Sequence, residues 1–211
     1  MTRARVLLAD DRLLVAEALK SLLAEEFDLV GVVQDGLAMV KAAMTLRPDV
    51  IVADITMPHL NGIEALAQLK QLAPDVRVVF LTMHHDVAYA RRALEAGAHG
   101  FVLKHSAPAE LILAVQAALQ DRTFITPTLA GEVLESIKRE PAGSDPVAAL
   151  TPRQREILQL LAEGGSAKHV AALLGISHRT VEFHKYQLME MLSIKSNAEL
   201  IHFAIKHGLV S

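Results

Sequence analysis

Five polar residues of this chain come directly after short apolar runs, and three of them are carboxylates: Asp10, Asp11, Asp54, Thr82 and Lys104. If those runs are strands of one sheet, the side chains share a pocket in which the carboxylates repel each other unless a cation offsets their charge. Mg²⁺ suits such a pocket because it prefers oxygen ligands, takes few of them from the protein and keeps several waters. We therefore expect a Mg²⁺ site that includes Asp11 and Asp54, with Asp10 as a ligand or directly behind the ligands.

Asp54 is the residue that this chemistry favours as a nucleophile. A carboxylate beside Mg²⁺ and an ammonium group can attack phosphorus, because the cations stabilise the negative charge that develops on the equatorial oxygens. Lys104 would supply the ammonium group. Any one of the five residues alone is more often a solvated acid, a helix cap or a surface lysine. Their joint placement after apolar runs is what favours a phosphoryl-transfer site.

Short apolar runs and amphipathic stretches alternate over the first 120 residues. The runs lie at 6–9, 29–33, 50–53, 76–81 and 100–103, and helical periodicity is present at about 12–25, 36–46, 62–72, 86–96 and 108–120. Five strands alternating with five helices predict a doubly wound α/β domain, in which a five-stranded parallel sheet is covered on both faces. In such sheets polar chemistry collects beyond the carboxyl ends of the strands, where the strand order reverses. The five polar residues are therefore expected in one pocket.

The pattern changes after Asp121. A helical segment at about 126–139 is followed by EPAGSDP (140–146), where two prolines, a glycine and small polar residues predict an interdomain linker. From Leu150 onward only helical periodicity remains, at about 152–162, 167–174, 178–192 and 197–207. We therefore predict one domain at 1–121, a linker helix and flexible linker at 122–149, and a small all-α domain of four helices at 150–211.

Composition excludes several classes of protein. The 211 residues, 52% of them hydrophobic, suffice for two cores, and the absence of cysteine excludes disulfides and thiolate metal sites. No stretch approaches the roughly 18 uninterrupted apolar residues of a membrane span, and the first apolar run is too short for a signal peptide. We expect a cytoplasmic protein with no membrane partner. The small excess of basic over acidic residues in 151–211 permits nucleic-acid binding without indicating it.

The first 120 residues resemble the receiver domain of two-component response regulators. The segments that carry the resemblance are LLADDR (7–12), IVADITMPHLNG (51–62), FLTMHH (80–85) and GFVLKHS (100–106). Pro58 and Gly62 follow Asp54 by four and eight residues, which is similar to the loop after the family's phosphorylated aspartate. The resemblance implies a flavodoxin-like fold and a sensor histidine kinase as the partner that phosphorylates Asp54.

The same resemblance implies roles for the other residues of the pocket. Mg²⁺ would be ligated by Asp11, Asp54 and the carbonyl of Thr56, and Lys104 would pair with the phosphoryl group. Thr82 would move to hydrogen-bond a phosphoryl oxygen, and Phe101 would turn inward as the switch aromatic. The switching surface would then lie around the helix at 86–96 and the strand at 100–103. His84 is either a residue that positions the attacking water or an ordinary loop histidine.

Residues 166–192 combine helix, glycine turn and helix. Val170, Leu173 and Leu174 give the first helix an apolar face. Gly175 permits a left-handed turn, and Ser177 is placed as the N-cap of the next helix. An apolar stripe there leaves the polar residues outside, which is the plan of a helix-turn-helix. Helical hairpins with a glycine turn are also common in ordinary packing, so the spacing alone leaves both interpretations open.

The whole segment from LTPRQREIL (150–158) to IKSNAELIHFAIKHG (194–208) resembles a LuxR-type DNA-binding domain, and with the receiver it is similar to the NarL/FixJ family. Residues 178–191 would be the recognition helix in the major groove of promoter DNA. The implied phosphate contacts are Arg179, Thr180, His184 and Lys185, and the implied base readers are Glu182, Phe183 and Tyr186. At Glu182 many relatives have lysine; its carboxylate can accept from cytosine but repels phosphates.

The last helix is the family's dimerisation element, and Leu200, Ile201 and Ala204 fit either that role or simple completion of the domain core. We expect a homodimer when the protein is phosphorylated or DNA-bound, with RNA polymerase as a further partner. The expected function is phosphorylation-controlled transcription, with no enzymatic activity beyond the receiver's own phosphotransfer and dephosphorylation. Two alternatives are an aspartyl phosphatase, which Thr56 disfavours because many such enzymes have a second carboxylate there, and a regulator that does not use phosphorylation.

Overall fold

A six-stranded parallel sheet forms the centre of the N-terminal domain. The computed structural model describes residues 3–83, 87–106, 108–139, 146–147 and 149–210. The strands are β1 (Arg5–Ala9), β2 (Asp28–Val33), β3 (Val50–Ala53), β4 (Arg77–Thr82), β5 (Gly100–Leu103) and β6 (Phe124–Ile125), in the spatial order β2-β1-β3-β4-β5-β6. The order reverses at β1 and β3, so their carboxyl ends define the expected crevice.

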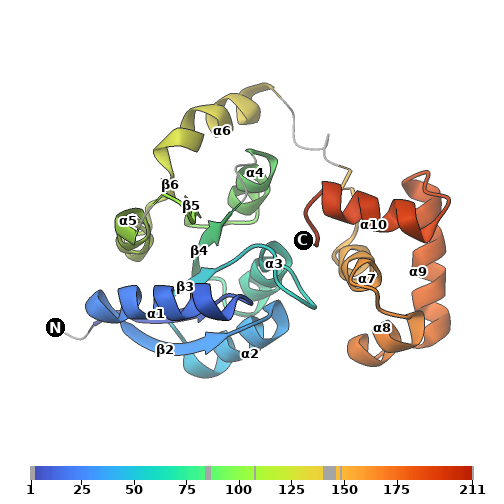
Figure 1. Ribbon diagram of the computed structural model, residues 1–211, viewed down its shortest axis with the longest axis horizontal. Helices are drawn as coiled ribbons and strands as arrows, with labels where there is room; N and C mark the ends of the chain where they lie inside the picture. Colours follow the sequence, from blue (N-terminus) through green and yellow to red (C-terminus); the bar gives the residue numbers. More distant parts are fainter. Residues whose placement is uncertain (1–2, 84–86, 107, 140–145, 148, 211) are drawn as a thin grey trace.

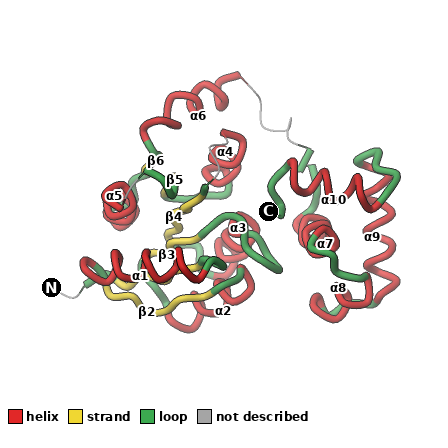
Figure 2. The backbone as a smooth tube through the Cα atoms, in the orientation of Figure 1, coloured by secondary structure: helices red, strands yellow, loops and turns green. Residues whose placement is uncertain are grey.

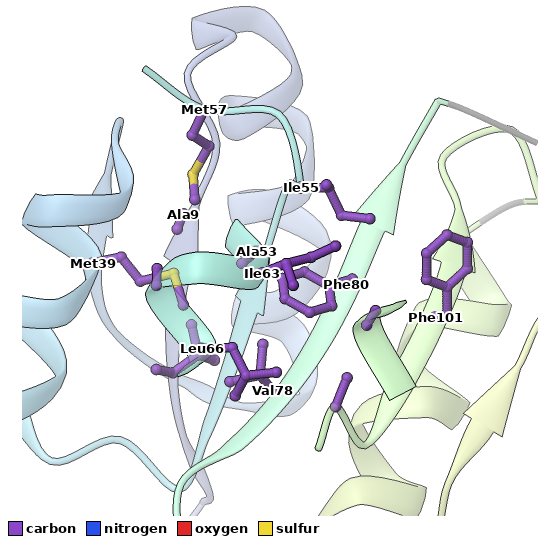
Figure 3. Close-up of a cluster of buried hydrophobic side chains, with 14 of the residues drawn as sticks. Ala9, Met39, Ala53, Ile55, Met57, Ile63, Leu66, Val78, Phe80 and Phe101 are labelled. Atoms are coloured by element: carbon purple, nitrogen blue, oxygen red, sulfur yellow. The ribbon is translucent and has the colours of Figure 1, made fainter. Parts of the chain in front are cut away.

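Helices cover both faces of this sheet (Figure 1). They are α1 (Leu13–Glu26), α2 (Gly36–Leu46), α3 (Gly62–Leu72), α4 (Val87–Glu95) and α5 (Pro108–Leu119). Residues of α1 and α5 pack in one core cluster with one side of the strands, and residues of α2, α3 and α4 pack in a second cluster on the other side. The second cluster includes Met39, Leu66, Phe80 and Phe101 (Figure 3). The doubly wound α/β prediction is confirmed.

The prediction of five strands was short by one. The two-residue strand β6 pairs with β5, and the fully buried Thr126 beside it accepts a hydrogen bond from the Leu103 N–H at 3.1 Å and donates one to Glu110 at 2.8 Å. Two residues are too few to show an alternating apolar pattern, so only the tertiary contacts reveal this strand.

The helix predicted at 126–139 is present as α6 (Pro127–Arg139), and it packs against the N-terminal domain. Leu129 and Val133 are fully buried in the same core cluster as Phe101. The segment predicted as a linker at 122–149 therefore contains a strand and a helix that belong structurally to the first domain.

Four helices build the described part of the C-terminal domain, as predicted. Figure 2 shows them in red. They are α7 (Pro152–Ala162), α8 (Ala167–Leu174), α9 (His178–Met191) and α10 (Asn197–Lys206). Thr151 and Gln154 form a capping box at α7, and the hydroxyl of Ser177 accepts from the Thr180 N–H at the start of α9. Gly175 ends α8 at φ 63°, a left-handed conformation that favours glycine.

In the part of the chain that the structure describes, two segments of the C-terminal domain have clear contacts with the first domain. One is α7, which lies against α3 and the loop that precedes it. The other is the end of the chain, where the His207 carbonyl accepts a hydrogen bond from Arg92 of α4 at 3.2 Å. Gly208, at φ 61°, has no room for a side chain because a Cβ atom would overlap the Tyr89 hydroxyl. In Figure 1, α9 lies on the side of its domain away from the sheet.

Among the described residues, no helix combines the length and apolar character that a membrane crossing requires.

Candidate phosphoacceptor site and DNA-binding helix

The predicted acidic pocket is present at the carboxyl ends of β1, β3 and β5. All four residues of β3 are buried, so the chain emerges from the core at Asp54 with only 4% of that residue exposed. Asp10 emerges from β1 in the same way, at 1% exposure. Carboxylate oxygens of Asp10, Asp11 and Asp54 all lie within 4.8 Å of one another.

Lys104 provides the positive charge of the pocket. Its Nζ atom lies 2.5 Å from Asp10 Oδ2 and 2.6 Å from Asp54 Oδ2, and all three side chains are at most 5% exposed. Buried carboxylates are costly unless they are paired and hydrogen-bonded, so a lysine shared by two of them is what makes this cluster compatible with folding. Lys104, which follows β5, thus balances the negative charges of Asp10 after β1 and Asp54 after β3.

Asp54 also accepts hydrogen bonds from the backbone. Its Oδ1 atom accepts from the Ile55 N–H at 2.6 Å and from the Thr56 N–H at 3.3 Å. Burial nevertheless raises the pKa of Asp54 above its usual value, because desolvation outweighs the stabilisation of the carboxylate by Lys104. An additional cation would lower that pKa again and favour the ionised nucleophile.

Two oxygen atoms beside the pocket are suited to a cation. Asp11 Oδ1 and Thr56 Oγ1 are buried and have no hydrogen-bond partner within the described residues. Buried polar atoms normally have partners, and a hard divalent cation with its waters would satisfy such oxygens. The donor set is made entirely of oxygens, so the pocket has the chemistry of a metal site.

The two predicted switch residues are both buried. Thr82 ends β4 at 1% exposure. Phe101 is fully buried in the core (Figure 3), in the same cluster as Leu129 and Val133 of α6. The Phe101 ring is therefore already inside the protein in this conformation. An inward turn on activation would have to start from a different conformation, in which the ring faces outward. His84 lies outside the described residues.

The residues predicted to contact DNA lie along α9, away from the N-terminal domain (Figure 1). Arg179, Glu182, Phe183 and Tyr186 are exposed, the two aromatic residues at 58% and 69%. Thr180, His184 and Lys185 are partly buried. Val181 and Leu188 hold this helix in the core of its domain, while its two aromatic residues stay exposed in the part of the chain that the structure describes.

The predicted dimerisation residues have mixed surroundings. Leu200 and Ala204 are buried in the core of the C-terminal domain at 2% and 0% exposure, whereas Ile201 is partly buried and lines a cavity between the domains. The first two therefore complete their own domain in this conformation, and dimerisation through α10 stays a prediction.

A polar stripe on α7 was missed by the sequence analysis. Arg155, Gln159 and Glu163 recur every four residues, and all three contact the first domain. Arg155 Nε lies 2.6 Å from Oε1 of Glu64, whose side chain is 4% exposed. A polar stripe at helical spacing is normally a solvated face, so the pattern alone gave no reason to expect an interface.

Comparison with known proteins assigns both halves of the chain. Residues 6–116 match the model of the response regulator receiver domain, and residues 148–204 match that of bacterial regulatory proteins of the luxR family. The chain is 37% identical over 217 residues to the transcriptional regulatory protein MctR of Rhizobium johnstonii, covering 98% of this chain and 95% of that one. It is 33% identical over 215 residues to the oxygen regulatory protein NreC of Staphylococcus epidermidis, covering 98% and 99%.

A solved structure shows the same architecture over nearly the whole length. It is RcsB from Salmonella enterica serovar Typhimurium, bound to a promoter in the presence of the phosphomimetic BeF₃⁻, with a TM-score of 0.65 at 26% identity over 96% of this chain and 98% of that one. Two family models and two relatives aligned over almost the full chain show the family. This chain therefore belongs to the two-component response regulators of the NarL/FixJ family, with a receiver domain followed by a LuxR-type DNA-binding domain.

Proposed function

We propose that this regulator accepts a phosphoryl group on Asp54 from a sensor histidine kinase and thereby controls the binding of α9 to promoter DNA. The observation that carries the proposal is the position of Lys104, whose ammonium group lies 2.5 and 2.6 Å from Asp10 and Asp54. A lysine at this place neutralises the carboxylate of Asp54 before the transfer. After the transfer, its ammonium group can pair with the phosphoryl oxygens instead.

In the transfer, an oxygen of Asp54 bonds to phosphorus while the bond between phosphorus and the kinase imidazole nitrogen breaks. The other ring nitrogen carries a proton, so the histidine leaves as neutral imidazole and Asp54 becomes the acyl phosphate. The backbone N–H groups of Ile55 and Thr56 hold the other Asp54 oxygen in place. Mg²⁺, held by Asp11, Asp54 and the Thr56 carbonyl with Asp10 beside them, would neutralise the phosphoryl oxygens. We assign Thr82 to a hydrogen bond with the phosphoryl group and Phe101 to the packing change that follows it.

The acceptor assignment is tested by intact mass after incubation with acetyl phosphate. We expect one phosphoryl adduct in the wild type with Mg²⁺, at least about 100-fold less without Mg²⁺, and none in Asp54→Asn, which keeps the shape but lacks the nucleophile. Asp75→Asn, on the exposed surface, is the matched control and should be phosphorylated normally. A wild-type protein that forms no adduct would overturn the proposal in favour of a phosphorylation-independent regulator.

We propose that α9 contacts phosphates through Arg179, Thr180, His184 and Lys185 and base edges through Glu182, Phe183 and Tyr186. The exposure of Arg179, Glu182, Phe183 and Tyr186 on the helix that faces away from the receiver supports this assignment. The structure of RcsB bound to a promoter is the relevant parallel among relatives. We also propose two-fold promoter sites and a homodimer through Leu200, Ile201 and Ala204, in which Leu200 and Ala204 first leave the core of their own domain. We further propose contact with RNA polymerase and action in the cytoplasm, where the DNA lies.

Arg179→Ala should weaken binding to duplex DNA of random sequence by about five- to tenfold at 0.1 M salt and reduce the slope of log K against log salt by about one, because one phosphate contact is lost. Fluorescence anisotropy of a labelled duplex measures both quantities. Lys20→Ala, which removes the same charge from the exposed surface of α1, should change neither. Equal salt slopes for wild type and Arg179→Ala would remove Arg179 from the set of phosphate contacts.

A further inference from the structure

Thr126 connects the end of β5 with the start of α5. Its hydroxyl oxygen accepts from the Leu103 N–H at 3.1 Å, and the hydroxyl donates to Oε2 of Glu110 on α5 at 2.8 Å. Thr126 and Leu103 are both fully buried. A hydroxyl has one proton, so donation to Glu110 leaves only the lone pairs of the oxygen for Leu103 and fixes the direction of both bonds.

The hydroxyl continues the hydrogen-bond ladder of β5 past the end of β6. The pairing of the two strands ends with Phe101 and Ile125, and the Thr126 N–H donates to the Phe101 carbonyl at 3.0 Å. The chain then enters α6 at Pro127. Leu103 lies two residues beyond Phe101, so its buried N–H would lose its acceptor if the hydroxyl were removed, which is costly.

The helix that follows Thr126 does not account for this arrangement. Thr126 directly precedes α6, and its carbonyl accepts from the Leu129 N–H at 2.9 Å and from the Ala130 N–H at 3.2 Å. A threonine at such a place usually turns its hydroxyl towards the first N–H groups of its own helix. Here the hydroxyl bonds β5 and α5, so it stabilises the end of the receiver sheet.

Leu103 is the residue before the lysine of the pocket. On the opposite side of β5, the Lys104 N–H donates to the Thr82 carbonyl at 2.8 Å, so β4 holds one residue and Thr126 holds the residue before it. From this backbone the Lys104 ammonium group reaches the two carboxylates of the pocket at 2.5 and 2.6 Å. A misplacement of about 1 Å in a reacting site can cost about 100-fold in rate. The two backbone bonds therefore bear directly on the chemistry.

We propose that Thr126, held by Glu110, is a positioning residue for phosphoryl transfer to Asp54. It acts through the Leu103 backbone and fixes the end of β5, so that the ammonium group of Lys104 stays at the acceptor. The short strand β6 and the residue after it are thereby part of the apparatus for phosphoryl transfer. This inference rests on the proposed phosphorylation of Asp54.

The decisive pair of variants is Thr126→Val and Thr126→Ser. Valine keeps the branched shape and loses the hydroxyl, whereas serine keeps the hydroxyl and loses a methyl group. In the full-length chain with Mg²⁺ and acetyl phosphate, we expect the adduct to form about tenfold more slowly in Thr126→Val. In Thr126→Ser the rate should stay within about twofold of the wild type. Intact mass at successive times measures these rates.

The affinity for Mg²⁺ distinguishes a displaced lysine from a pocket that is damaged in general. The proposed metal ligands follow β1 and β3, and Lys104 is the cation that competes with the metal for Asp54. Calorimetric titration should therefore show that Thr126→Val binds Mg²⁺ at least as tightly as the wild type, although its transfer is slower. Weaker Mg²⁺ binding in Thr126→Val would show general damage and overturn the role of Thr126.

Variants of two neighbouring residues make the comparison specific. Val133→Ala removes fully buried packing from α6 but leaves the Thr126 hydroxyl in place. It should lower the melting temperature and keep the rate within about twofold of the wild type. Glu110→Gln keeps an oxygen that accepts from Thr126 and should also transfer normally. Glu110→Leu removes that acceptor, should slow transfer by about threefold, and serves as the test variant should Thr126→Val not fold.

The outcomes separate this inference from the proposed function. If the wild type forms no adduct, the proposed function fails, and this inference fails with it. If the wild type is phosphorylated and Thr126→Val is as fast as Thr126→Ser, this inference alone is overturned. The same holds if Val133→Ala is as slow as Thr126→Val, since lost packing would then be the cause. Rates are compared at a temperature at which circular dichroism shows each variant to be folded.

Discussion

Replacing Lys104 with methionine is expected to lower the free energy of unfolding by about 3 kcal/mol in metal-free buffer, and to abolish phosphorylation by acetyl phosphate. The lysine is the shared partner of Asp10 and Asp54, at 2.5 and 2.6 Å, and methionine leaves two buried carboxylates side by side. Removal of one partner from a buried ion pair typically costs about 3 to 5 kcal/mol. Urea denaturation followed by circular dichroism measures the loss.

The sign of the pH dependence follows from the raised pKa of Asp54. In the metal-free folded protein Asp54 keeps its proton to a higher pH than in the unfolded chain, so the stability contribution of this group is present below the unfolded pKa and falls as pH rises through the folded one. Without Lys104 the pKa of Asp54 should rise further, and the deficit of Lys104→Met should be larger at pH 8 than at pH 5. Addition of Mg²⁺ should recover part of this loss of stability.

Lys20→Met is the matched control for Lys104→Met. Lys20 pairs with Glu17 at 3.4 Å, and the two side chains are 50% and 70% exposed. Exposed pairs contribute about 0 to 1 kcal/mol, so this variant should unfold almost like the wild type. If both lysine variants lost the same stability, the charge balance described for the pocket would be wrong.

Replacing Arg155 with methionine should open the interface between the two domains. Arg155 is the cationic partner of Glu64, whose side chain is 4% exposed while the domains are in contact. Its loss leaves a carboxylate that regains water only if α7 moves away. A buried charge without a partner costs about 3 kcal/mol or more, so the closed form should be disfavoured by roughly 100-fold.

The absence of cysteine makes this prediction straightforward to measure. Spin labels on cysteines introduced at the exposed residues Glu25 of α1 and Lys168 of α8 report the distance between domains. The wild type should show one narrow distance distribution and Arg155→Met a broader one. Arg155→Met combined with Glu64→Gln removes both charges and should return the distribution toward the wild type. A narrow, unchanged distribution in Arg155→Met would show that this ion pair does not hold the domains together.

The pocket of the receiver could be predicted from the sequence because each of its residues is fixed by a local rule. Buried strands read as apolar runs, parallel strands end at one edge, and Asp10, Asp54 and Lys104 follow such runs. The helix boundaries in both domains followed in the same way from periodicity, with caps such as Ser177 and Gly175. Local chemistry and chain direction were sufficient for these features.

Strand β6 and the burial of α6 were not accessible in this way. The strand has two residues, and Leu129 and Val133 could equally have formed the apolar face of a free linker helix. Strand β6 depends on the open edge of β5, and the place of Leu129 and Val133 in the core depends on the contact of α6 with α4. Both are properties of the assembled domain. For the same reason the fully buried position of Phe101 became apparent only from the structure.

The sequence by itself determined the two domains, the acidic pocket and the helix-turn-helix, because these arise from patterns within short segments. Only the tertiary structure decided what the polar stripe of Arg155, Gln159 and Glu163 contacts, because the same stripe on an isolated helix would face water. The contact joins residues about one hundred positions apart, such as His59 with Glu163 and Asn61 with Gln159. No local rule specifies such pairs, since they depend on how two separately folded domains fit together.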